Sequence, residues 1–152
     1  MKYDWKDAGE EWSEPWGSSA AQWSGAILPR LRGCLPAATI LEIGAGFGRW
    51  THYLRNHCER LLVLDRKEEC IAACRERFSG DKRLTHFVND GRSLSMLPDE
   101  SIDFVLNALA SGSPAKQTGA PAEVSAAIVS QRETRVNMGK QSLKDAGPTS
   151  VF

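Results

Sequence analysis

Long hydrophobic runs and net charge are both missing from this 152-residue sequence. The longest aliphatic run, Leu61–Leu64, is far shorter than the roughly 20 residues that a membrane-spanning helix needs. Nineteen basic and nineteen acidic residues cancel, so no overall field attracts nucleic acid or an anionic membrane. We therefore expect a soluble, cytoplasmic chain that binds a small molecule and has no nucleic-acid or membrane partner.

Cysteine and histidine are also scarce, and neither shows the spacing of a metal site. The four cysteines contain no CxxC pair, and only Cys70 and Cys74 lie four residues apart on a predicted helix. We interpret all four as buried free thiols and predict no disulfide framework and no metal site. The three histidines have no partner in the sequence that indicates catalysis, so no catalytic residue is assigned.

Tryptophan is confined to the N-terminal part of the chain. All five tryptophans lie in the first fifty residues, and we predict that residues 1–38 form a helical flank. Ser18 or Ser19 would cap a helix there, and Pro29 would end it early. Three apolar residues share one face of this helix: Trp23, Ile27 and Leu31. Two roles stay open for the tryptophans, a lid over a ligand and packing into the core.

From residue 39 onward, short apolar runs alternate with amphipathic stretches. The runs predict four strands: Thr39–Ile43, Leu61–Leu64, Leu84–Val88 and Ile102–Leu106. The stretches between them predict two helices: Arg49–Cys58 and Lys67–Phe78. This alternation is typical of an α/β fold with a Rossmann-like, doubly wound parallel sheet, here in residues 39–107. Ligands of such sheets bind at the carboxyl ends of the strands.

Residues 108–152 are rich in alanine, serine, glycine and proline and poor in large apolar residues. Such a segment buries too little apolar surface to offset the entropy lost when a chain becomes ordered. We therefore predict a disordered tail, with at most one short helix over Pro121–Arg135.

The segment LEIGAGFGRW places a glycine turn directly after the first predicted strand. Glu42 leads the turn, and three glycines follow at every second position: Gly44, Gly46 and Gly48. A dinucleotide-binding turn has the pattern GxGxxG, whose third glycine would fall at Arg49. The turn therefore favours another ligand that lies close to the backbone, with a purely structural turn as the alternative.

Two further carboxylates follow predicted strands. Asp65 comes about 20 residues beyond the turn, where a carboxylate binds a ribose diol; the alternative is an N-cap for the next helix. Asp90 follows the third strand, where it would bind the exocyclic amine of adenine; the alternative is an ordinary Asn-Asp-Gly turn. Because parallel strands bring their carboxyl ends to one edge, these residues and the glycine turn predict one crevice for an adenosine ligand.

Three segments, ILEIGAGFGRW, LLVLDRKEEC and HFVNDGRSLSMLPDESIDFVLN, together resemble the first half of a class I S-adenosylmethionine-dependent methyltransferase. The resemblance covers about residues 12–107 and rests on three motifs in the family's order and spacing. It implies an incomplete sheet with strand order 3-2-1-4, and S-adenosylmethionine as the cofactor. A methyl group would pass to an acceptor that the sequence does not identify.

The resemblance also implies a role for each matching residue. Glu42 would lie near the ammonium group of the cofactor, and Asp65 would bind its ribose hydroxyls. Arg66 would lie along the adenine, Asp90 would bind the adenine amine, and the backbone at Gly91 would close around the ring. The loop under the methionine part would consist of four residues: Gly44, Ala45, Gly46 and Gly48.

The sequence departs from the family after Asn107. The family's sheet continues past its fourth strand, whereas we expect no fifth, sixth or seventh strand in this chain. The fourth strand would then be an exposed apolar edge that favours self-association. We therefore expect a truncated domain that binds S-adenosylmethionine more readily than it turns over. A non-catalytic binding remnant and an NAD-type oxidoreductase are the alternatives.

Overall fold

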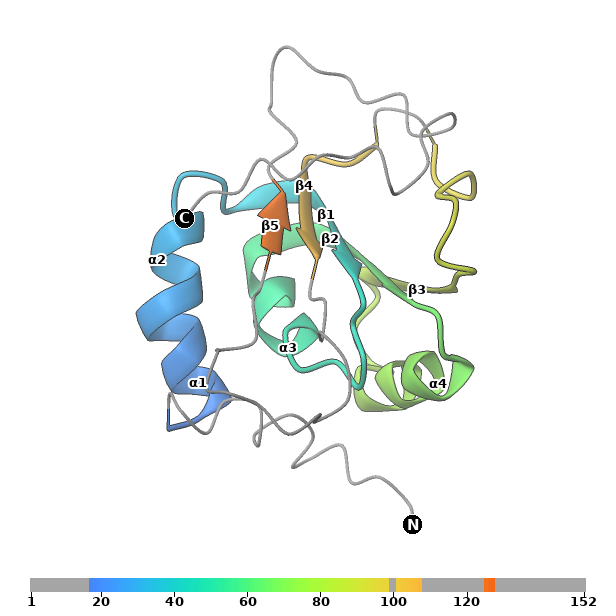
Figure 1. The fold of residues 1–152 in the computed structure, drawn as a ribbon, viewed down its shortest axis with the longest axis horizontal. Helices are drawn as coiled ribbons and strands as arrows, with labels where there is room; N and C mark the ends of the chain where they lie inside the picture. The colour runs from blue at the N-terminus through green and yellow to red at the C-terminus, as the bar shows by residue number, and fades with distance from the viewer. Residues whose placement is uncertain (1–16, 99–100, 108–124, 128–152) are drawn as a thin grey trace, which may run out of the picture.

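The computed structural model describes residues 17–98, 101–107 and 125–127, in which helices pack on a single sheet (Figure 1). The strand order is β3-β2-β1-β4-β5. The strands are β1 (Ala37–Ile43), β2 (Cys58–Asp65), β3 (Leu84–Val88), β4 (Phe104–Asn107) and β5 (Ser125–Ala127). The first four are mutually parallel. The predicted α/β class and the order 3-2-1-4 are therefore confirmed.

The fifth strand differs from the prediction. β5 pairs antiparallel with β4, so that Ser125 lies opposite Asn107 and Ala127 opposite Val105. The expectations of no fifth strand, of an open outer edge on β4 and of a helix across Pro121–Arg135 are wrong at these residues. An apolar edge strand is stabilised when its backbone N–H and C=O groups find partners, and such non-local pairing leaves no local periodicity. The remainder of the predicted tail lies outside the described residues.

β1 is a central strand whose side chains are buried on both faces of the sheet. Ile40, Leu41 and Glu42 are all fully buried. A continuous apolar run is typical of a parallel strand covered on both sides. Because side chains alternate along a strand, Ile40 lies in the core under the helices and Leu41 in the core on the opposite face.

The core on one face of the sheet contains helical residues from the N-terminal flank and from the two helices that follow β1 and β2. α3 (Thr51–Leu54) continues into the 3-10 turn η3 (Arg55–His57), and α4 spans Glu68–Arg77. Their buried side chains meet those of β1, β2 and β4 in one cluster. On the opposite face, Leu94 and Leu97 from the connection between β3 and β4 pack against the sheet.

The N-terminal flank forms one continuous helical segment in three parts: α1 (Ser19–Gln22), the π-helical turn η2 (Trp23–Ile27) and α2 (Leu28–Leu31). The predicted cap is confirmed, because Ser18 Oγ accepts a hydrogen bond from the Ala21 N–H at 3.1 Å. Pro29 does not end the segment as predicted. It lies in the first turn of α2, where its missing N–H matters little, directly after the wider turn. Residues 1–16 lie outside the described part.

The flank is part of the main core. Trp23 is only 5% exposed and stacks on Tyr53 of α3, with ring centroids 5.3 Å apart. It also lies 6.1 Å from the ring of Trp50. Of the two roles left open for the tryptophans, the structure shows packing for these two.

The first predicted helix is shorter than expected at both ends. It begins at Thr51, and Cys58 is the first residue of β2, opposite Ala37 of β1. Pairing with β1 therefore overrides the helical pattern at this residue. The second predicted helix agrees closely, since Lys67 and Phe78 are the caps of α4.

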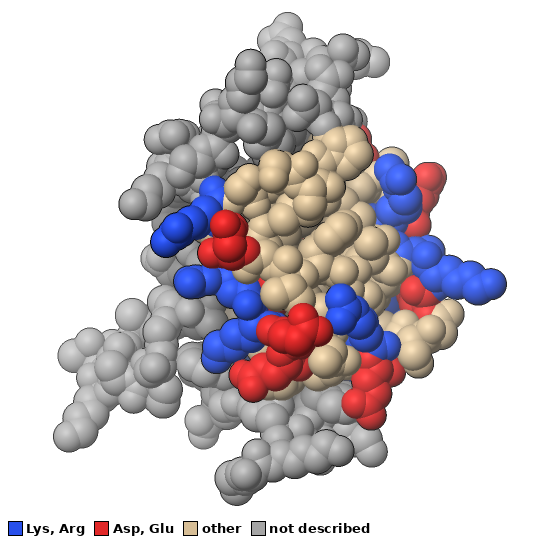
Figure 2. Space-filling view, turned by 90° about the vertical axis from the view of Figure 1, so that its right-hand side faces the viewer, with Lys and Arg blue, Asp and Glu red and all other residues tan. Residues whose placement is uncertain are grey.

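The side of the molecule that carries β3 and α4 shows basic and acidic residues interspersed around an uncharged centre (Figure 2). No patch of one sign dominates this view, in keeping with the zero net charge of the sequence. Val88 of β3 and Met96 are the large apolar side chains exposed among the described residues, at 41% and 39%. None of the helices in the described ranges is long and apolar enough to span a membrane.

Candidate functional site

The glycine turn follows β1 and is attached to the end of β2. Gly44 and Ala45 donate their backbone N–H groups to the Leu64 carbonyl, at 2.8 and 3.2 Å. Gly44, Gly46 and Gly48 have φ values of 75°, 55° and 83°. Only glycine adopts these left-handed values without strain, so the alternating spacing of the three glycines follows from the path of the turn.

Gly46 and Gly48 have different surroundings. A Cβ atom on Gly48 would lie 2.6 Å from the Phe78 ring and 3.1 Å from Cys74 Sγ, so this glycine lets the turn pack on α4. A Cβ atom on Gly46 would meet no described residue within 4 Å. The open side of the turn is therefore at Gly46, which is where a ligand can approach the backbone.

Asp65 joins the end of β2 to the glycine turn. Its Oδ2 accepts a hydrogen bond from the Gly46 N–H at 2.8 Å, and its Oδ1 accepts one from the Lys67 N–H at 2.9 Å. The alternative role as N-cap of α4 is wrong, because Lys67 is the N-cap and no side chain caps the helix. The structure thus brings Asp65 and the open glycine together.

Glu42 lies fully buried, on the strand that leads into the turn. Thr51, the first residue of α3, donates its hydroxyl to Glu42 Oε2 at 2.6 Å, whereas Oε1 has no partner among the described residues. Burial raises the pKa of Glu42 to about 8, although the Thr51 hydrogen bonds act in the opposite direction. The side chain is therefore largely neutral at pH 7, and one of its two oxygens has no hydrogen-bond partner in the described part of the chain.

The ends of β2 and β3 also meet. The Asn89 N–H donates to the Asp65 carbonyl at 3.0 Å, and the buried Asn89 side chain accepts from the Gly91 N–H. Gly91 has φ 75°, and a Cβ atom there would lie 2.8 Å from Arg66 Cδ. The Arg66 side chain therefore lies against Gly91 and bridges the two strand ends.

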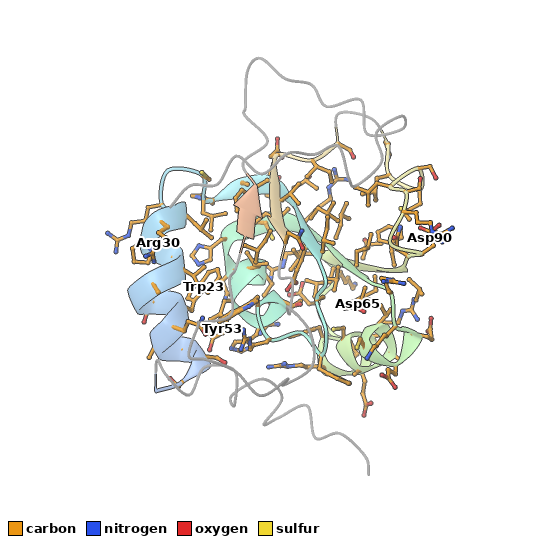
Figure 3. All side chains as sticks on the ribbon, viewed as in Figure 1. Trp23, Arg30, Tyr53, Asp65 and Asp90 are labelled. Atoms are coloured by element: carbon orange, nitrogen blue, oxygen red, sulfur yellow. The ribbon has the colours of Figure 1, made fainter. Side chains whose placement is uncertain are left out.

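Asp90 is not gathered with the other carboxylates. It is exposed, and its Oδ1 accepts hydrogen bonds from the Arg92 and Ser93 N–H groups at 2.8 and 3.3 Å. These bonds lower its pKa below the ordinary value, the one from Arg92 most. The labelled Asp65 and Asp90 lie well apart in Figure 3. The geometry of Asp90 is that of the turn named above as its alternative.

All four cysteines are free, but Cys34 and Cys58 are only half-buried, so the prediction of buried thiols is wrong for these two. Cys70 and Cys74 are buried free thiols, and burial raises their pKa values to about 11 and about 12. Within the ranges that the structure describes, no three His, Cys, Asp or Glu side chains gather as a metal site would require.

Comparison with known proteins identifies the family. Residues 40–129, more than half of the chain, match the family model described as a methyltransferase domain. The chain belongs to the methyltransferase domain family. This confirms the resemblance drawn from the sequence and disfavours the NAD-type oxidoreductase.

Two relatives of this methyltransferase domain match about half of it. Nodulation protein S of Rhizobium tropici is 32% identical over 71 residues, which are 47% of this chain and 29% of that protein. An S-adenosylmethionine-dependent methyltransferase from Mesorhizobium loti is 32% identical, with a TM-score of 0.47 over 57% of this chain and 42% of that one.

A SAM-dependent methyltransferase from Aquifex aeolicus shares the fold, with a TM-score of 0.50 and 19% identity. The match covers 70% of this chain and 57% of that one. The methyltransferase domain therefore spans less than two thirds of the length of each of these three relatives.

Three polar residues of this methyltransferase domain went unnoticed or unassigned in the sequence. Thr51 donates a hydrogen bond to Glu42. In the sequence, the one feature that could have indicated this contact is a hydroxyl residue at the start of the helix after the turn. Asn107 ends β4 beside Ile43, and its buried Oδ1 has no partner among the described residues. Asp103 binds the Thr39 N–H at 2.7 Å and so fastens β4 to β1, which is a structural role.

Proposed function

We propose that this chain binds S-adenosylmethionine at the carboxyl ends of β1, β2 and β3 and transfers its methyl group to an acceptor. The observation that carries the proposal is the 2.8 Å hydrogen bond between Asp65 and the open glycine of the turn, Gly46. This bond places a carboxylate beside the open backbone of the turn. The ribose of the cofactor would bind the carboxylate, and the methionine part would lie along the backbone.

The residues present fit this cofactor. Each Asp65 oxygen accepts one backbone N–H and keeps a further lone pair, so the carboxylate can still bind both hydroxyls of a ribose. Gly44 to Gly48 would face the methionine part, of which Gly48 acts through packing on α4. Ala45 is buried and forms the floor of the turn.

Adenine would be bound between the ends of β2 and β3. Arg66 already lies against Gly91, and it directly follows Asp65. We expect the Arg66 side chain to move aside and cover one face of the ring. Asp90 would reach the adenine amine only with an oxygen that its own turn leaves free, since Oδ1 accepts two N–H groups.

Glu42 suits a cationic ligand better than a pyrophosphate. A buried acceptor without a partner is costly, and a nearby positive charge would favour the ionised carboxylate. S-adenosylmethionine supplies an activated methyl group, so the protein mainly has to align an acceptor with it. A hydroxyl or ammonium acceptor would also have to lose a proton, and we assign no base for it among the described residues.

Binding without turnover is the second candidate function. The described residues supply contacts for the cofactor at the ends of β1, β2 and β3, whereas none of them is assigned to a methyl acceptor. A methyl-transfer assay with a broad acceptor panel separates the two candidates, because only the first gives multiple turnovers.

Titration calorimetry tests the binding proposal. S-adenosylmethionine and S-adenosylhomocysteine should bind and NAD should not. Asp65→Asn should weaken binding about 10- to 100-fold, because one hydroxyl loses a charged acceptor. Glu59→Gln is the matched control, since Glu59 is exposed at the other end of β2. Equal affinities of wild type and Asp65→Asn would refute the assignment of this site.

A further inference from the structure

A polar groove lies near the amino ends of the strands, whereas the cofactor crevice lies at their carboxyl ends. A groove of about 390 Å³ opens between the ends of η3 and α4, next to the amino ends of β2 and β3. We call it the arginine groove. Its lining consists of six residues: Arg55, Arg77, Phe78, Gly80, Asp81 and Arg83. A volume of this size falls in the range of small-molecule sites.

Most of the side chains that line the arginine groove are basic. Three guanidinium groups face one carboxylate. Asp81 is bound by Arg83 through two hydrogen bonds of 2.7 and 2.8 Å, and Arg55 lies 3.6 Å from it. The hydrogen bond from Arg83 lowers the pKa of Asp81, so the carboxylate stays ionised at neutral pH. Asp81 is therefore already bound by Arg83 and lies close to Arg55, and no second carboxylate lines the groove among the described residues.

Arg55 is the side chain with unused donors. Its Nε is buried and has no hydrogen-bond partner in the described part of the chain. Its guanidinium lies over the Phe78 ring, 5.4 Å from the centroid, while Arg77 lies 5.1 Å from the same ring. A buried charged N–H without an acceptor is costly, and a ligand oxygen would remove that cost.

We propose that the arginine groove binds the phosphate group of a small phosphorylated ligand, at a site separate from the cofactor crevice. Guanidinium groups bind phosphate through paired, charge-assisted hydrogen bonds, which fixes the ligand class as an oxyanion. The groove is larger than a phosphate ion, so the ligand has room for an organic part as well.

Arg77 is unsuitable as a test of this site. Its Nη1 donates to the Phe47 and Gly48 carbonyls, both at 3.1 Å, so it also holds the glycine turn. Arg55 is better, because among the described residues its guanidinium contacts only groove residues. Arg75 provides a matched control, since it lies on α4, is exposed and pairs with Glu68 outside the groove.

The test is a titration of the ¹⁵N-labelled full chain with inorganic phosphate at constant ionic strength, followed by amide chemical shifts. The amides of Gly80 and Arg83 should shift in a saturable way, and that of Gly46 should not. Arg55→Gln should weaken binding about tenfold or more, and Arg75→Gln should leave it unchanged. Saturating S-adenosylhomocysteine should not displace the phosphate.

Arg55→Lys distinguishes a specific phosphate site from simple charge attraction. It also provides a second variant if Arg55→Gln does not fold. It keeps the charge but loses the Nε–H and the fork geometry, so we expect a loss close to that of Arg55→Gln. Wild-type affinity in Arg55→Lys, equal loss in Arg75→Gln, or shifts confined to the glycine turn would each overturn the proposal. Because the cofactor crevice is titrated separately, failure here leaves the proposed function intact.

Discussion

The buried carboxyl of Glu42 makes protein stability depend on pH in a way that one substitution removes. Burial raises the pKa of Glu42 from 4.5 to about 8, so the folded protein holds a proton that the unfolded chain releases. The contribution of Glu42 to the free energy of unfolding is then highest below pH 4.5 and falls as the pH rises toward about 8. Above that pH both states are ionised and this contribution becomes constant.

Glu42→Gln keeps the shape and the hydrogen bond with Thr51 but cannot titrate. At about 1.4 kcal/mol per pH unit, the wild type should lose about 2 kcal/mol relative to Glu42→Gln between pH 6 and pH 8. Urea denaturation of both proteins at the two pH values measures this double difference. Other titrating groups, such as His52 and His86, cancel because both proteins contain them.

A pH-independent difference between the two proteins would refute the reasoning. It would mean that Glu42 is already ionised in the folded state, and therefore that its side chain reaches water or a cation. The reasoning would also fail if, between pH 6 and pH 8, Glu42→Gln lost more stability than the wild type.

Three further outcomes follow from the packing around the turn. Gly48→Ala should destabilise the fold by about 2–4 kcal/mol, against about 1 kcal/mol for Gly46→Ala, because only the first adds a clash to the backbone strain; thermal denaturation compares them. Trp23→Ala should cost about 3–5 kcal/mol and leave the ligand affinity of the folded fraction unchanged, whereas weaker binding by a stable variant would indicate a lid. Thr51→Val should cost about 1–3 kcal/mol in urea unfolding, because Glu42 loses its partner.

The parts of the fold that could be predicted are those whose signal is local. β3 (Leu84–Val88) matches its apolar run, and α4 matches a helical periodicity bounded by its caps. Cys58 was assigned to a helix because its apolar spacing fits α3, but parallel pairing with Ala37 extends β2 to include it. β5 could not be foreseen, since a three-residue strand exists only through its partner.

The candidate site shows the same limit. Asp65 and the glycine turn were recognisable because a carboxylate and glycines at strand ends carry meaning by position alone. The burial of Glu42 was not, because it depends on α3 folding back to place Thr51 above the strand. Asp90 has the expected position, but the direction of its carboxylate is set by hydrogen bonds within its own turn.

The position of the third glycine explains why this turn differs from a dinucleotide-binding one. In the GxGxxG pattern the third glycine lets the following helix pack closely on the strand. Here that position is Arg49, whose guanidinium lies 4.1 Å from the centroid of the Trp50 ring, so a long side chain is accommodated there. Close packing instead occurs one residue earlier, where Gly48 contacts Cys74 of α4 and Phe78 at the end of that helix. The turn is thereby held against α4 and leaves Gly46 open beside Asp65, which suits a ligand that lies across the strand ends more than a pyrophosphate seated on a helix N-terminus.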